Sequence, residues 1–167
     1  MKLEAVRIVD FQGCPVENLL TTQSASIEIE FVVFKGGKYL KPNLLLKGGS
    51  GNALFWSTDT NPALRRMPLD EGKYKSSMLI PTDFLAPGTI SISNRNRTNA
   101  SGLERHARAA DVISLNVVDD FSEHSIRCGY QGPIPGFVRP RMTWTMQRRE
   151  ENNMNRFDIS LCAIGQP

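Results

Sequence analysis

The sequence predicts an all-β protein, an immunoglobulin-like or jelly-roll antiparallel β-sandwich of about eight or nine strands. Three observations lead to this fold class. Hydrophobic residues recur at every second position in several short stretches, clusters of Gly, Pro, Asn and Asp separate those stretches, and no long stretch repeats at the helical period. The chain has 167 residues, which is enough for one domain with a stable hydrophobic core.

The clearest predicted strand covers residues 26–34. Ile27 and Ile29 are apolar, whereas Glu28 and Glu30 alternate with them on the opposite face. This alternation is typical of a half-buried antiparallel strand. The same reasoning predicts strands at residues 3–9, 43–47, 53–57, 74–80, 89–95, 111–118 and 138–146, and a last one at 156–163. A short helical turn is expected at 83–85, where Thr82 is placed to cap its N-terminus.

We expect the sandwich to occupy residues 1–146, and residues 147–167 to form a linker and a terminal strand. The linker region, 147–155, is charged and polar throughout. The terminal strand either pairs within its own chain or is exchanged between subunits. Trp144, near the end of the sandwich, is expected in the core or at a dimer contact.

Composition narrows the function classes. A net charge of +3 falls short of the concentrated basic surface of a nucleic-acid-binding protein. No apolar run approaches the roughly 20 residues that span a bilayer, and the first residues lack the apolar core of a secretory signal, so a cytoplasmic location is expected. Cys14, Cys128 and Cys162 are odd in number and far apart, which favours reduced thiols.

Motifs for catalysis, metals and cofactors are missing. Residues 48–51 (Gly-Gly-Ser-Gly) form a turn without the lysine of a phosphate-binding loop, and His106 and His124 have no metal-ligand spacing. Asp119 and Asp120 are adjacent on a strand end and so face opposite ways, unlike the paired carboxylates of a glycosidase. We therefore predict no catalytic residue, no metal and no cofactor. A hydrolase whose active site is assembled from residues far apart in the sequence stays an alternative.

Sugar recognition fits the residue pattern better. A sugar has an apolar C–H face and a rim of hydroxyls, which suit an exposed aromatic ring and planar polar groups. In residues 53–57, alternation places Trp56 opposite Phe55 and predicts it on the outer face. The predicted carbohydrate-binding residues are Trp56, Tyr74, Ser91, Ser93, Arg95, Asn116 and His106. The same pattern also fits an ordinary solvated sheet, with Trp56 packed under a loop or at a subunit contact.

The order of four segments carries a family resemblance. Residues 49–60, 81–93 and 111–118 are followed by a Gly/Pro-rich stretch at 129–144. This order resembles the C-terminal carbohydrate-binding domain of Wzt-type polysaccharide ABC transporters, over residues 6–144. The resemblance implies a non-catalytic module that binds the non-reducing terminus of a lipid-linked O-antigen before export.

The resemblance also implies an assembly. The domain would be a homodimer attached to the transporter ATPase, next to the membrane subunits, at the cytoplasmic face of the inner membrane. No ATPase motif lies in this sequence, so a binding module attached to a glycosyltransferase is an alternative. A second alternative is a β-sandwich that binds protein rather than sugar, with Trp56 or Trp144 at the contact.

Overall fold

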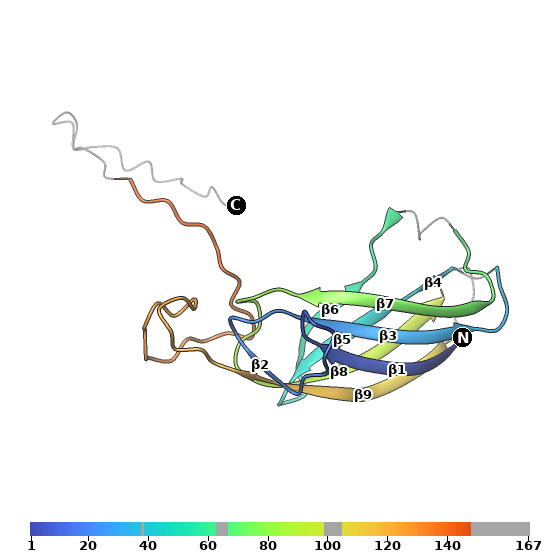
Figure 1. The fold of residues 1–167 in the computed structure, drawn as a ribbon, viewed down its shortest axis with the longest axis horizontal. Coiled ribbons are helices and arrows are strands. Elements are labelled where there is room, and N and C mark those ends of the chain that lie inside the picture. Colours follow the sequence, from blue (N-terminus) through green and yellow to red (C-terminus); the bar gives the residue numbers. More distant parts are fainter. Residues whose placement is uncertain (38, 63–66, 99–104, 148–167) are drawn as a thin grey trace, which may run out of the picture.

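The computed structural model describes residues 1–37, 39–62, 67–98 and 105–147, without the side chains of 40–41, 94–98 and 105–112. Within that part of the chain it confirms the predicted β-sandwich, with nine strands (Figure 1). No helix among these residues is long and apolar enough to cross a membrane. The strands are β1 (Lys2–Val9), β2 (Asn18–Leu20), β3 (Ala25–Val33), β4 (Leu40–Lys41), β5 (Asn43–Gly48), β6 (Ala53–Thr58), β7 (Gly72–Ile80), β8 (Gly88–Thr98) and β9 (Arg105–Val118).

Two sheets form the layers of the sandwich. Sheet A has the order β1-β3-β7, and sheet B has the order β2-β9-β8-β5-β6, with β4 paired to β8. All pairs are antiparallel except β2 with β9. On one side β1 contacts β9 of the other sheet. The strands β6 and β7 are the remaining long edges, one from each sheet.

The core lies between the sheets and follows the predicted alternation. Every second residue of β3, beginning with Ala25 and ending with Val33, is buried. From sheet B, Leu46, Ile92 and Leu115 are fully buried against them. Each buried side chain of this size stabilises the fold by about 1.5–3 kcal/mol. The polar residues between them are therefore directed to the outer faces of both sheets.

Two sequence predictions fail near the C-terminal end. The helical turn expected at 83–85 is not formed, because Asp83 has a positive φ of 51° and Leu85 instead makes a β-bridge with Val138. The strand expected at 138–146 is limited to that bridge, since Pro140 has no N–H to donate. Trp144 is 90% exposed, so its predicted place in the core is wrong for the single chain. The strand expected at 156–163 lies outside the described residues.

Three charged side chains hold the segment that follows β9. The Oδ2 atom of Asp119 accepts hydrogen bonds from Arg127 Nε at 2.5 Å and from Arg139 Nη1 at 3.2 Å. Arg127 also donates to the carbonyls of Tyr130 and Gly132, at 3.0 and 2.7 Å. All three charged side chains are at most 10% exposed. This buried cluster fixes the Gly/Pro-rich segment against the end of the sandwich.

The cluster perturbs the carboxyl group of Asp119. Burial raises its pKa, but the hydrogen bonds from Arg127 and Arg139 outweigh burial and hold the pKa below the ordinary value of 3.8. A lowered pKa in the folded state stabilises the fold above the pKa of the unfolded chain. This contribution is lost as the pH falls through the pKa of the folded state.

Candidate functional site

The outer face of sheet B brings together several of the residues singled out in the sequence. Strand register places Leu45 opposite Trp56 and Ser93, while Ser91 is opposite Lys47 and Ser114. Because alternate residues of these strands fill the core, the residues between them point outward. We call this surface the polar face, and it carries Asn18, Leu45, Lys47, Trp56, Thr89, Ser91, Ser114 and Asn116.

Trp56 is the aromatic group of the polar face. Its neighbour Phe55 is half-buried and packs edge-to-face on Phe84, with ring centroids 5.4 Å apart. Alternation along β6 then turns Trp56 outward, where 58% of it is exposed. Its cross-strand partner Leu45 is half-buried. An exposed indole beside an aliphatic neighbour offers a flat apolar platform for the C–H face of a sugar.

Beyond Lys47 on β5, the polar groups of this face on β8 and β9 are small and uncharged. Ser91 is half-buried, and Ser114 and Asn116 are exposed. The Asn116 Nδ2 atom donates to Asn18 Oδ1 at 3.0 Å, which orients the amide on the surface. These hydroxyls and amides can each donate and accept hydrogen bonds, as recognition of sugar hydroxyls requires.

Ser93 is on the predicted face but is not accessible. It lies opposite Leu45, in the same row as Trp56, yet it is only 1% exposed. Ile92 pairs with Ile113 and Asn94 pairs with Ala109, so three residues of β9 oppose Ser93 alone. The extra backbone of this β-bulge crowds the position. The prediction that Ser93 faces a ligand is therefore wrong in this structure.

Tyr74 belongs to the other sheet. It lies on β7, stacks on Phe31 with ring centroids 5.6 Å apart, and donates its hydroxyl to the carbonyl of Asp70 at 3.0 Å. This side chain packs against the core and is separated from the polar face. Arg95 and His106 lie in β8 and β9, but their side chains fall outside the described residues.

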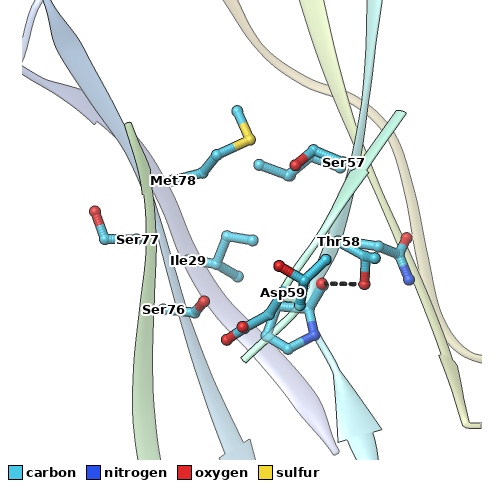
Figure 2. Close-up of a pocket in the computed structure, with 11 residues that line it drawn as sticks. Ile29, Ser57, Thr58, Asp59, Ser76, Ser77 and Met78 are labelled. Carbon is cyan, nitrogen blue, oxygen red and sulfur yellow. Dashed lines mark hydrogen bonds between the residues drawn. The ribbon is translucent and has the colours of Figure 1, made fainter. Parts of the chain in front are cut away.

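A cleft opens where the edge strands β6 and β7 face each other, and its volume is about 240 Å³. Figure 2 shows Ile29 and Met78 projecting toward Ser57 of the opposite sheet. Ser77 points away from the gap. The lining comprises Ile29, Pro42, Asn43, Leu44, Ser57, Thr58, Asp59, Thr60, Ser76, Ser77 and Met78. The cleft thus combines an apolar floor with a rim of hydroxyl groups.

Asp59 is the one charged residue among the described residues that line the cleft. Its Oδ1 atom accepts a hydrogen bond from the Asn61 N–H at 2.8 Å, and the Thr58 hydroxyl donates to the Pro42 carbonyl at 3.2 Å. The hydroxyls of Ser57 and Ser76 make no hydrogen bond to any described residue. These two hydroxyls can therefore bind a ligand without breaking an existing contact.

Sequence reasoning missed the cleft and the buried cluster of Asp119. The run Ser57-Thr58-Asp59-Thr60 directly follows Trp56 and is a usable signal for polar groups near the platform. Its partners on β7 come from a distant part of the chain, and only the packing of the two sheets joins them. Among the described residues, no three His, Cys, Asp or Glu side chains lie close enough to hold a metal ion together.

Comparison with known proteins supports the fold. No family model matches the chain, and no curated protein matches it. The crystal structure of the C-terminal domain of Wzt superposes with a TM-score of 0.66 at 15% identity, covering 87% of this chain and 83% of that one. The chain has the fold of the Wzt C-terminal domain.

A second solved structure is more distant from this Wzt-like fold. A β-glucosidase from Listeria innocua in complex with gluconolactone gives a TM-score of 0.40 at 11% identity, over 70% of this chain and 15% of the enzyme. A score this low carries no argument about function.

Proposed function

We propose that the protein is a non-catalytic carbohydrate-binding module whose polar face recognises the non-reducing terminus of a lipid-linked O-antigen polysaccharide. The observation that carries the proposal is Trp56, an exposed indole on a sheet face that has mainly hydroxyl and amide groups and one lysine, Lys47. The fold shared with the Wzt C-terminal domain supports the choice of a polysaccharide for ABC-transporter export.

Binding at this face is expected to be weak for a single chain end. One sugar ring stacks on Trp56, and neighbouring rings hydrogen-bond with Ser91, Ser114 and Asn116. Each neutral hydrogen bond contributes only about 0.5–1.5 kcal/mol after water is displaced. Micromolar to millimolar dissociation constants follow, about −4 to −8 kcal/mol. Two linked copies would bind clustered chains more tightly than either copy alone.

The exposed C-terminal residues favour a protein contact as well. Met142, Trp144 and Met146 are 66%, 90% and 98% exposed, and Figure 1 shows residues 141–147 running away from the sandwich. Alternate apolar residues in an extended segment suit addition to another subunit. We therefore propose a homodimer joined through this segment, held by the transporter ATPase and membrane subunits at the cytoplasmic face of the inner membrane.

The two tryptophans of the chain allow a direct test. Variants Trp144→Phe and Trp56→Phe each keep one indole, so fluorescence reports the polar face in the first and the C-terminal segment in the second. Each is titrated with O-chain from the source organism and with an unrelated O-chain. We expect saturable change only in Trp144→Phe, only with the cognate chain.

Trp56→Ala should abolish binding while Trp144→Ala retains it, with amide NMR spectra showing both folded. The absence of any spectral change with millimolar chain ends would refute carbohydrate recognition. A response confined to the Trp56→Phe variant would place the contact on the C-terminal segment and refute the assignment of the face.

A further inference from the structure

The cleft between β6 and β7 adjoins the polar face around a single edge strand. Trp56 and Thr58 are two residues apart on β6 and therefore point to the same side, while Ser57 between them points into the cleft. β6 is the last strand of sheet B, so no further strand separates the polar face from the cleft opening. A glycan lying across Trp56 can continue over this edge.

The size of the cleft suits one sugar ring. Its volume of about 240 Å³ is below the roughly 300–1,000 Å³ of pockets that hold drug-sized ligands. A single terminal residue of a polysaccharide is smaller than such ligands. The cleft therefore has room for one sugar ring rather than for several.

The chemistry of the cleft is divided between its floor and its rim. The half-buried Met78 offers aliphatic surface above the buried Ile29 and Leu44, which favours C–H or methyl groups over hydroxyls. Ser57 and Ser76 supply hydroxyls that bond to no described residue. A ring with one apolar edge and one hydroxyl edge matches both halves of the lining.

The charge of the cleft selects against anions. The Asp59 carboxylate lies on the rim, and Figure 2 shows it directed toward the gap beside Ser76. No Lys, Arg or His belongs to the lining among the residues described. A carboxylate or phosphate on the ligand would therefore meet a like charge at short range.

We propose that this cleft is the end-reading subsite of the module, and that it binds a neutral terminal sugar whose apolar edge carries a methyl group, as in a 6-deoxyhexose. The inference rests on the proposed function, because the preceding sugars are placed on Trp56. It adds a second location to that function. The polar face binds the preceding sugars of the chain, and the cleft binds its terminal sugar selectively.

Free monosaccharides that differ only at C6 provide the probe. The galacto, gluco and manno series are each tested as 6-deoxyhexose, hexose and hexuronate, following the methyl NMR signals of Met78 and Ile29. In at least one series we expect saturable shifts, with the 6-deoxyhexose about tenfold tighter than the hexose. The hexuronate should give no shift at tens of millimolar.

Substitutions in the cleft sharpen this test. Ser76→Leu fills the gap and should abolish the monosaccharide shifts, whereas Ser26→Leu, on the outer face of sheet A and outside the lining, should keep them. Asp59→Asn keeps the size of the side chain and removes its charge. It should bring hexuronate binding to within a few fold of the hexose.

The experiments distinguish a wrong assignment of the cleft from a wrong assignment of the polar face. If no sugar of the three series shifts Met78 or Ile29, the subsite is refuted, and the O-chain response of Trp56 decides the proposed function separately. If hexuronates bind the unsubstituted protein as tightly as hexoses do, the proposal that the cleft selects neutral sugars is refuted. Equal loss in Ser76→Leu and Ser26→Leu would place the sugar elsewhere.

Discussion

The outer faces of the two sheets are built from the same alternating pattern but carry opposite chemistry. On sheet A, ion pairs join Arg7 to Glu30 at 2.6 Å and Lys75 to Glu28 at 2.6 Å. On the polar face of sheet B, Lys47 is the one charged residue among the described side chains. Hydroxyls, amides, Trp56 and Leu45 occupy the other outward positions there.

This difference indicates which face is suited to a neutral ligand. The charged groups of sheet A already bind one another and their water, so a sugar would have to displace both. The uncharged groups of the polar face are less strongly hydrated, and the indole of Trp56 loses unfavourable contact with water when a sugar covers it. Of the two outer faces, the polar face is therefore the one better suited to a neutral ligand.

The largest effect is expected where paired charges are buried rather than exposed. Asp119→Ala would leave Arg127 and Arg139 buried without their carboxylate, which should lower the free energy of unfolding by about 3 kcal/mol. Urea unfolding measures the change. Glu123→Ala, at an exposed position of the same segment, is the control and should change little. Equal effects of the two substitutions would mean that the cluster does not hold the segment.

A matched pair of serines compares the two faces directly. Ser114→Val removes a hydroxyl from the polar face and should weaken O-chain binding about fivefold, as loss of one neutral hydrogen bond predicts. Ser26→Val makes the same change on the outer face of sheet A, opposite Leu79, and should leave the affinity unchanged. Calorimetric or NMR titration measures both. A greater loss for Ser26→Val would reverse our assignment of the faces.

The sequence predicted the sandwich because its alternation is local. Ile27 and Ile29 are separated by Glu28, and that pattern alone requires a half-buried strand. The exposure of Trp56 followed from the same rule, applied to a neighbour that packs on Phe84. Where the period is uninterrupted, the sequence is enough to assign a face.

The features that could not be predicted from the sequence depend on contacts between residues far apart in the chain. The burial of Ser93 comes from a bulge in β9 that no alternation of β8 reveals. Tyr74 could not be assigned to a face, because both faces of its strand contain a serine and a hydrophobic residue. The partnership of Asp119 with Arg139 spans a Gly/Pro-rich segment whose path is determined by the ion pairs themselves.

A smaller effect on stability is expected from a substitution on the outer face of sheet A. Arg7→Gln removes the pair with Glu30, whose side chains are 45% and 32% exposed. Solvent and salt screen such pairs, so the midpoint of urea unfolding should move little and O-chain affinity should not change. Urea unfolding and O-chain titration of the Arg7→Gln variant are measured under the same conditions as for Ser114→Val and Ser26→Val. A loss of affinity here would show that sheet A contributes to recognition.

The smallest expected effect concerns the acid titration of Glu30. The hydrogen bond from Arg7 outweighs desolvation and holds the pKa of the Glu30 carboxyl below its ordinary value of 4.5. The pair therefore stabilises the fold above the pKa of the unfolded chain, and this contribution disappears as the pH falls through the lower folded-state pKa. Carboxyl-carbon NMR should show a midpoint below 4.5 that rises toward 4.5 in Arg7→Gln. An unchanged midpoint would mean that the two charges are solvated separately, and the contrast between the faces would then rest on Trp56 and its neighbours alone.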